Sequence, residues 1–427
     1  MKNFLKASVA ALLSMLARWI VAKYRPTIIM VTGSVGKTST KDALYAALKN
    51  QTFVRASEKS YNSEFGVPLT IIGAGNPWNS SVKWIIVFKE ALALLVLPNH
   101  YPKLLILEVG ADRPGDLMKI LRIATPHAVV VTRLPEVPVH VEAYTSPEAV
   151  REEEFVPAYG LAPAAPLIVP ADDAYALTYA KRLPLTVSTF GYDESADVRI
   201  TDVGVLTGGS AVRGMRATLA AYGASHEYIV AGALGRSQLL APAAAFATAH
   251  ALGFDDGETL KGLAAYAAPP GRARILAGIH GTTLIDDTYN SSPAAVEEAL
   301  ASLSLVPSKR CVVVLGDMLE LGRYSVEAHA KVGKAAAECA DIIVAVGIRA
   351  KKIAESAKTC GIDEECILMF DTSITAAREL PQHIQEGDVV LVKGSQSIRM
   401  ERIVEALLAD PGDADKLVRQ EREWKDR

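Results

Sequence analysis

The stretch Thr32-Gly33-Ser34-Val35-Gly36-Lys37-Thr38-Ser39 decides the fold that this sequence of 427 residues predicts. An apolar, β-branched run over residues 27–31 precedes it, and a helical pattern over residues 41–48 follows it. Strand, glycine loop, Lys-Thr and helix form the layout of a phosphate-binding loop, in which glycines let backbone N–H groups turn toward phosphate oxygens. The helix N-terminus adds a partial positive charge, so an anion is the expected ligand.

Two side chains of this loop have expected roles. Lys37 would reach the β- and γ-phosphates of a nucleotide, and the Thr38 hydroxyl would hold Mg²⁺. The glycine spacing departs from the common motif, because Val31 stands where the first glycine would be. A glycine turn that caps an ordinary strand–helix unit is the alternative, and Gly-Lys-Thr between a strand and a helix argues against it.

Length and composition limit the class of protein. A chain of 427 residues predicts two or three domains, and an apolar content of 50% with modest charge is typical of a soluble globular enzyme. A net charge of −3 argues against nucleic acid as the main partner. No Cys-x-x-Cys pair occurs among Cys311, Cys339, Cys360 and Cys366, so we expect buried or free thiols of a reducing cytoplasm. The expected oligomeric state is a monomer.

Residues 1–26 predict a helix with one apolar face and basic flanks. The expected apolar face comprises Leu5, Val9, Leu12, Leu16, Trp19 and Ile20, and the basic residues are Lys2, Lys6, Arg18, Lys23 and Arg25. The apolar run is too short for a membrane span, and no cleavage site follows it. Two interpretations stay open: an interfacial helix at the inner face of a membrane, or a helix packed on its own domain.

From residue 27 to about residue 265, strands alternate with helices. Buried parallel strands are expected at residues 104–110, 128–132 and 167–169, and antiparallel strands between residues 197 and 230. Ligands bind beyond the carboxyl ends of such strands, which places Glu108 and Thr132 on the rim of the glycine loop.

The very apolar segment 84–97 has two interpretations. We favour a buried helix over a second membrane-facing surface.

Around Pro269-Pro270-Gly271-Arg272 the pattern is interrupted, and a second α/β pattern begins with strands expected at residues 311–315, 342–346, 367–370 and 389–392. The segment after Pro411 reads as a solvated helix or tail. The predicted fold class is therefore α/β. An N-terminal helix (1–26) precedes a central P-loop domain with a mostly parallel sheet (27–267) and a C-terminal Rossmann-like domain (268–427).

Several further segments, together with the glycine loop, resemble motifs of the Mur ligase family, most closely its D-alanyl-D-alanine-adding branch. They are Asn62-Ser63-Glu64-Phe65-Gly66-Val67-Pro68, Glu108-Val109-Gly110-Ala111, His140-Val141-Glu142-Ala143-Tyr144, Asp286-Asp287-Thr288-Tyr289-Asn290-Ser291-Ser292-Pro293, Gly316-Asp317-Met318-Leu319-Glu320-Leu321-Gly322 and Lys393-Gly394-Ser395. The similarity spans about residues 27–408, and so many ordered motifs make it specific to the family.

The resemblance implies an ATP- and Mg²⁺-dependent acid–amino-acid ligase of peptidoglycan precursor synthesis. A muropeptide-like carboxylate would attack the γ-phosphate to give an acyl phosphate and ADP, and the amine of an amino acid or dipeptide would then displace phosphate. A related folylpolyglutamate or poly-amino-acid ligase is an alternative within the same chemistry. A non-catalytic nucleotide-binding scaffold is the alternative outside it.

The resemblance also implies roles for single residues. Catalytic roles fall to Lys37, His140 and the hinge residue Arg272, and the metal ligands would be Thr38, Glu108 and His140. Nucleotide contacts are implied for Gly33, Ser34, Val35, Gly36, Lys37, Thr38, Ser39, Asn62, Gln238, Asp287 and Asn290. Taken singly, Glu108 could be a cap residue, His140 a loop histidine and Asp286-Asp287 a turn; their order beside the glycine loop favours the functional roles.

The chain departs from the family pattern at four places. Glu154, or Glu153 if the register shifts by one, stands where the family carries a carbamylated lysine, and we predict that it replaces this group as a metal-side carboxylate. Ser237-Gln238 replaces a His-Asn pair that seats adenine. Gln396 replaces an arginine near the amine substrate. About thirty residues precede the loop, too few for the usual UDP-binding domain.

Overall fold

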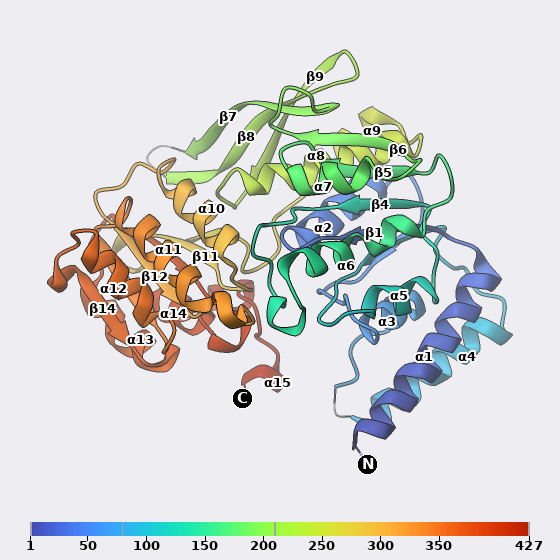
Figure 1. Cartoon of the computed structure of the whole chain (residues 1–427), viewed down its shortest axis with the longest axis horizontal. Coiled ribbons are helices and arrows are strands. Elements are labelled where there is room, and N and C mark those ends of the chain that lie inside the picture. Colours follow the sequence, from blue (N-terminus) through green and yellow to red (C-terminus); the bar gives the residue numbers. More distant parts are fainter. Residues whose placement is uncertain (1, 79, 209–210, 426–427) are drawn as a thin grey trace.

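The structure is a computed structural model that describes residues 2–78, 80–208 and 211–425, with side chains from residue 8 to residue 424. Two α/β lobes lie side by side, each built on its own sheet (Figure 1). The predicted α/β fold class, with a phosphate-loop sheet and a second Rossmann-like sheet, is confirmed. The four cysteines are free.

The first lobe is built on nine strands in the order β2-β3-β1-β4-β5-β6-β7-β8-β9. Neighbouring strands from β2 to β7 run parallel, and β7, β8 and β9 form an antiparallel extension, as the sequence predicts. The strands are β1 (Thr27–Thr32), β2 (Val54–Ala56), β3 (Leu104–Glu108), β4 (Ala128–Val131), β5 (Pro166–Pro170), β6 (Thr186–Gly191), β7 (Val198–Gly208), β8 (Ala211–Ala221) and β9 (Ala224–Ala231).

Helices cover both faces of this sheet, which explains why its central strands are apolar at consecutive positions. In β1, Ile29 and Val31 pack in the core beneath α2 and α8, while Ile28 and Met30 pack in the core of the opposite face. The helices are α1 (Lys2–Tyr24), α2 (Lys37–Leu48), α3 (Gly66–Ile72), α4 (Ser81–Val96), α5 (Asp116–Leu121), α6 (Pro147–Tyr159), α7 (Ala174–Ala180), α8 (Ser237–Ala251) and α9 (Asp256–Leu263).

The second lobe is built on six strands in the order β10-β11-β15-β12-β13-β14. Only the pair β10–β11 is antiparallel. The strands are β10 (Arg274–Ala277), β11 (Thr283–Asp287), β12 (Cys311–Gly316), β13 (Ile342–Val346), β14 (Ile367–Phe370) and β15 (Val389–Lys393). The helices are α10 (Pro293–Leu303), α11 (Ser325–Ala337), α12 (Lys351–Thr359), α13 (Ser373–Glu379), α14 (Glu401–Leu407) and α15 (Arg422–Lys425).

Helix α1 packs on α3 and α4, but the face it buries differs from the predicted one. Leu13, Leu16 and Ile20 are buried, whereas Leu12 and Trp19, predicted on the same face as Leu16, are exposed. The side chains of Leu5, Lys2 and Lys6 lie outside the described residues. Within the described part of the chain, no helix combines the length and hydropathy needed to cross a membrane.

The prediction that segment 84–97 is a buried helix is wrong. In α4 only Val87 and Ala91 are buried. Its exposed apolar residues are Val82, Ile85, Ile86, Leu92 and Val96, and the partly buried Trp84, Phe88, Leu94 and Leu95 pack against the core. The physical reason is that α4 packs against α1 and α3 at the outer edge of the lobe, where nothing described covers its far side.

The segment after Pro411 begins as the predicted solvated helix, a 3-10 helix at Pro411–Lys416 with no buried residue, but the residues that follow it directly are not solvated. Leu417 and Arg419 are buried, and the Arg419 guanidinium lies 2.7 Å from a carboxylate oxygen of buried Glu401. The chain then continues to α15, which lies near the bottom of the view in Figure 1, beside the C-terminus.

Candidate active site between the two lobes

The phosphate loop joins β1 to α2, and two of its glycines have positive φ angles, 111° at Gly33 and 95° at Gly36. A side chain at Gly33 would collide with the Thr132 hydroxyl, which donates to the Thr32 carbonyl at 2.9 Å. Thr132 therefore lies directly against the loop, on the rim that the sequence predicts. Ser34 also faces the site: its hydroxyl oxygen is buried and lacks a hydrogen-bond partner.

Glu154 on α6 contacts the phosphate loop through hydrogen bonds and an ion pair. One carboxylate oxygen accepts hydrogen bonds from the Gly33 N–H at 3.1 Å and the Thr32 hydroxyl at 2.9 Å, and the other lies 3.8 Å from the Lys37 ammonium. Burial raises the pKa of Glu154, and the charge of Lys37 opposes that rise. The Lys37 ammonium also donates to the Gly33 carbonyl. Glu153 instead accepts backbone N–H groups at the start of α5, so Glu154 is the residue that reaches the loop.

A second carboxylate, Glu108 at the end of β3, faces the first turn of α2. The Thr38 hydroxyl donates to one of its oxygens at 3.2 Å, and the Ser60 hydroxyl donates to the same oxygen. The other Glu108 oxygen is buried without a hydrogen-bond partner. A carboxylate with a free oxygen beside a threonine hydroxyl is a donor set that suits a hard cation such as Mg²⁺.

His140 connects the two lobes. Its Nδ1 lies 3.0 Å from a carboxylate oxygen of Glu320 in the second lobe, and its Nε2 lies 3.6 Å from Asp112. Burial alone would lower the pKa of His140, but the hydrogen bond to Glu320 and the two carboxylate charges outweigh burial and raise it. The left-handed backbone of His140, with φ at 66°, presents the imidazole toward the second lobe.

Two cavities between the lobes bring most of the predicted residues together. One of about 570 Å³ is lined by Ser34, Lys37, Thr38, Asn62, Glu108, His140, Arg272 and Asn290. The other, of about 720 Å³, is lined by Val35, Gly36, Ser39, Gln238, Arg272 and Asp287. Arg272 borders both, and its guanidinium lies 4.2 Å from the centre of the Tyr289 ring. Glu154 lines neither cavity and acts on them through the loop.

The residues from the second lobe are held by a buried lysine. The Lys393 ammonium lies 2.7 Å from Asp287 and donates to the Asn290 carbonyl at 3.0 Å. Across the larger of these two cavities, the Gln238 carbonyl oxygen is buried without a hydrogen-bond partner. Unsatisfied buried acceptors are costly, so Gln238 and Glu108 indicate where a ligand would bind.

Sequence reasoning missed four participants: Asp112, Glu320, Ser60 and Lys393. Glu320 and Lys393 lie inside motifs that the sequence singled out, but only the tertiary structure shows that they contact His140 and Asp287. Asp112 directly follows the Glu108-Val109-Gly110-Ala111 motif, which was an available signal. Ser60 carried no signal in the sequence.

The fold and the site define a two-lobed α/β nucleotide-binding enzyme, in which a phosphate-binding loop on one lobe faces polar residues on the other. Residues 31–249 match the Mur ligase middle domain, and residues 271–396 match the glutamate ligase domain of Mur ligases. This chain belongs to the Mur ligase family, and it is an ATP-dependent ligase of the acid–amino-acid class.

Individual proteins that are similar to this chain are also Mur ligases. The UDP-N-acetylmuramoyl-tripeptide–D-alanyl-D-alanine ligase of Bacillus subtilis is 25% identical over 403 residues, which cover 93% of this chain and 79% of the relative. The ligase of the same name from Synechocystis is 29% identical over 388 residues, 90% of this chain and 75% of the relative. A MurF ligase from Thermotoga maritima, solved in complex with ADP, has a TM-score of 0.76 and 27% identity, covering 93% of this chain and 83% of that one.

Proposed function

We propose that this enzyme uses ATP and Mg²⁺ to join a D-alanyl-D-alanine-type amine to the carboxylate of a muropeptide, through an acyl phosphate. The observation that carries the proposal is the shared cavity in which Lys37, Thr38 and Glu108 of one lobe face Asn290 of the other. Relatives that carry the D-alanyl-D-alanine ligase name align with most of both lobes, which supports this branch.

The proposed roles follow from the contacts. Lys37 and the loop N–H groups hold the transferring phosphate, since phosphoryl transfer depends on positioning and charge neutralisation. Thr38 and Glu108 would hold Mg²⁺, which supplies further charge neutralisation when bound, and His140 stands nearby. Asp287, Asn290 and Gln238 border the space for the nucleoside. Arg272 sits at the junction of both cavities, where closure of the lobes excludes water from the acyl phosphate.

For Glu154 we propose that its carboxylate replaces the carbamylated lysine in an indirect way. It positions the phosphate loop by accepting a hydrogen bond from the Gly33 N–H and by pairing with the Lys37 ammonium. ATP turnover should then be independent of added bicarbonate. A Glu154→Ala variant should lose most Mg²⁺-dependent turnover, while Glu153→Ala, which loses only contacts to α5, should keep it. Full turnover by Glu154→Ala would contradict this role.

The test of the reaction is product analysis. The enzyme is incubated with ATP, Mg²⁺, UDP-N-acetylmuramoyl-tripeptide and D-alanyl-D-alanine, and products are identified by mass spectrometry, with hydroxylamine to trap the acyl phosphate. The expected result is the extended peptide and a hydroxamate. ADP release only with glutamate and a folate would favour the folylpolyglutamate alternative, and absence of ADP with every acceptor would favour a scaffold. Gln396, which lines the cavity beside Lys393, is the position at which amine specificity would change.

The proposed state is a cytoplasmic monomer that touches the inner face of a membrane through residues 1–25. Support comes from the exposed Leu12, Met15 and Trp19 on α1, whose neighbours include Arg18. Flotation with liposomes should recover the intact chain, and a chain that lacks residues 1–25 should float less. Equal flotation of both would count against this contact, and size-exclusion chromatography checks the monomer.

A further inference from the structure

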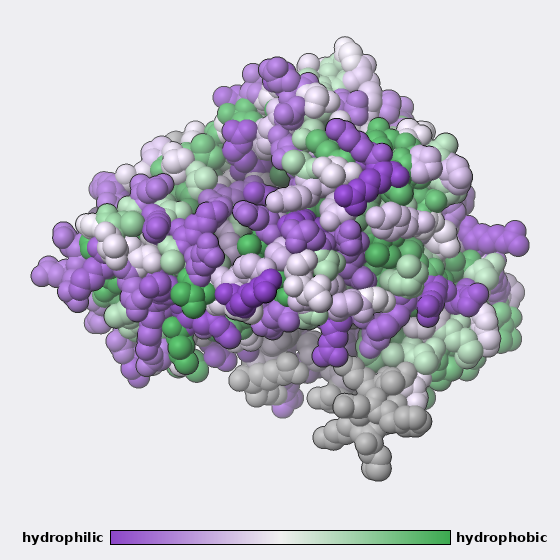
Figure 2. Space-filling view, viewed as in Figure 1, coloured by the Kyte–Doolittle hydropathy of each residue, from purple (hydrophilic) through white to green (hydrophobic). Residues whose placement is uncertain are grey.

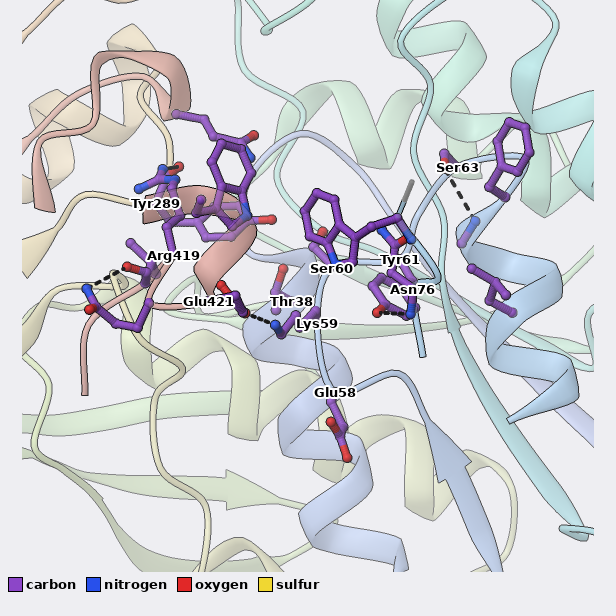
Figure 3. Close-up of a pocket in the computed structure, with 18 of the residues that line it drawn as sticks. Thr38, Glu58, Lys59, Ser60, Tyr61, Ser63, Asn76, Tyr289, Arg419 and Glu421 are labelled. Atoms are coloured by element: carbon purple, nitrogen blue, oxygen red, sulfur yellow. Dashed lines mark hydrogen bonds and ion pairs between the residues drawn. The ribbon is translucent and has the colours of Figure 1, made fainter. Parts of the chain in front are cut away.

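A third cavity, of about 1220 Å³, reaches from Thr38 of the phosphate loop to Val9 of α1 and Ile85 of α4; Figure 3 draws part of its lining. At one end it is lined by Thr38, Ser60 and Arg272. Between its walls, Lys59 pairs with Glu421 of the C-terminal segment, and the rings of Trp78 and Trp424 pack edge to face at 6.1 Å. Both lobes therefore contribute to its walls.

The lining of this cavity changes character along its length. At the end beside the loop, the hydroxyl groups of Thr38 and Ser60 and the charged groups of Lys59 and Glu421 lie close together (Figure 3). The far end is apolar and aromatic: Phe65, Trp84 and Phe88 form a row, with the Trp84 ring 6.3 Å from Phe65 and 6.1 Å from Phe88. Val9 of α1 and Ile85 of α4 complete this end. Such a cavity fits a molecule with a polar head and an apolar neighbouring part.

The apolar end continues onto the outside of the molecule. Ile85 both lines the cavity and is exposed, and the same outer side of α4 carries exposed Val82, Leu92 and Val96. Leu12, Met15 and Trp19 are exposed on α1. The two helices lie side by side at one end of the first lobe (Figure 1), and hydrophobic side chains gather over that end (Figure 2). An exposed apolar surface of this extent marks an interaction site.

The charge of this surface indicates what it contacts. Among the side chains that the structure describes, α1 and α4 carry four basic residues and one acidic residue, in a chain whose net charge is −3: Arg18, Lys23, Lys83, Lys89 and Glu90. The Lys23 ammonium donates to the Leu94, Leu95 and Leu97 carbonyls, so it ties α1 to the end of α4. Exposed apolar residues flanked by basic ones are typical of a surface that lies on an anionic bilayer.

We infer that the α1–α4 surface docks on an anionic bilayer and that the acceptor substrate is amphipathic. Its carboxylate-bearing head occupies the cavity beside Thr38, and its apolar chain passes Trp84 and Ile85 into the membrane. This inference rests on the proposed ligase function and adds the class of acceptor to it. It also assigns α4, and not residues 1–25 alone, to the docking surface.

The docking surface is tested with the full chain and vesicles of phosphatidylcholine with about 30% phosphatidylglycerol, the anionic component. A Val82→Asp/Val96→Asp variant changes two residues that are 67% and 76% exposed and do not line the cavity. Its vesicle-bound fraction should fall about tenfold, because binding scales with buried apolar area. The matched control is Val326→Asp/Ile348→Asp, at 66% and 78% exposure on the second lobe, which should bind as the unchanged chain does. Unaltered binding of the Val82/Val96 variant would overturn the surface.

The acceptor class is tested with two probes that share one muramoyl-tripeptide head. One is the UDP form in solution, and the other is a synthetic form with an alkyl chain, inserted in the same vesicles. We expect kcat/KM for the alkyl form to exceed that for the UDP form by about tenfold or more, because the membrane concentrates both reactants. The gain should vanish in the Val82/Val96 variant and persist in the control.

The outcomes separate this inference from the proposed function. Extension of the UDP form alone would overturn the amphipathic acceptor and leave the ligase reaction standing. If neither form were extended, binding without ATP would still decide the inference: Trp78, Trp84 and Trp424 line the cavity, so tryptophan fluorescence reports occupancy. Affinity for the alkyl form no higher than for the UDP form would overturn it.

Discussion

Lys37 lies between the Gly33 carbonyl and the Glu154 carboxylate, so its charge is held at the loop before a nucleotide arrives. A Lys37→Ala variant should lose about 10²–10³-fold in ATP turnover, the usual effect of removing one preorganised charge that faces the reacting group. ADP release measures this. Lys49→Ala, which removes an exposed lysine at the other end of α2, should turn over ATP normally, and a similar loss in both variants would contradict a specific role.

Asp286, next to the candidate nucleotide ligand Asp287, should make stability depend on pH. Burial raises its pKa from 3.8 to about 6. The folded protein keeps this proton where the unfolded chain has released it, so the free energy of unfolding falls as pH rises from about 4 to about 6, by about 1–3 kcal/mol.

The measurement is urea unfolding at pH 4.5 and pH 7. An Asp286→Asn variant, uncharged at both pH values, should lack this contribution to the difference. Asp371→Asn, at a position whose side chain is 77% exposed, should keep it. An unchanged pH difference in the Asp286 variant would show that its carboxyl titrates normally.

At the scale of elements, one face of α1 packs against the first lobe and another face is exposed to solvent. Leu13 is fully buried and the adjacent Leu12 is 42% exposed. A Leu13→Ala substitution should cost about 2–4 kcal/mol of unfolding free energy, as expected for a buried leucine, whereas Leu12→Ala should cost under about 0.5 kcal/mol. Chemical denaturation checks both. Equal small effects would mean that α1 is not part of the cooperative fold.

The central strands of the first sheet could be predicted from the sequence because their residues form continuous apolar runs. Residues 104–107 and 128–131 are apolar at every position because helices cover both faces of the sheet, and such runs have few other interpretations. The exposure of helix α4 could not be predicted from the sequence. Its composition is that of a buried helix, and only its place at the edge of the lobe leaves it exposed. Composition reports how apolar a segment is and says nothing of what covers it.

At the scale of the whole molecule, the His140–Glu320 contact joins the lobes and should weaken as pH rises. A histidine whose folded pKa is raised contributes its full stabilisation below about pH 6.5, its unfolded value, and loses it as pH rises through the folded pKa. The thermal unfolding midpoint, measured without nucleotide or metal, should therefore fall more between pH 6 and pH 8.5 in the unchanged chain than in Glu320→Gln. The difference is expected to be worth under about 1 kcal/mol.

The matched control is Glu297→Gln, because Glu297 pairs with Lys331 within the second lobe and does not join the two lobes. It should show the same pH dependence as the unchanged chain. If Glu320→Gln did so as well, the contact would carry no weight in solution. The division at residues 267 and 268 stays a prediction, and limited proteolysis near Pro269-Pro270-Gly271 would test it.

By itself, the sequence determined the phosphate loop, the α/β class of both sheets, the ligase family and some of the residues that line the nucleotide cavities. These depend on local patterns: a glycine that must adopt positive φ, a lysine and a threonine at the start of a helix, and apolar runs of strand length. The tertiary structure alone decided that His140 meets Glu320, that Lys393 holds Asp287, that Glu154 supports the loop, and that α4 faces outward. The three contacts join residues far apart in the chain, and the exposure of α4 depends on what packs beside it. Both follow from the packing of the lobes, which no local pattern encodes.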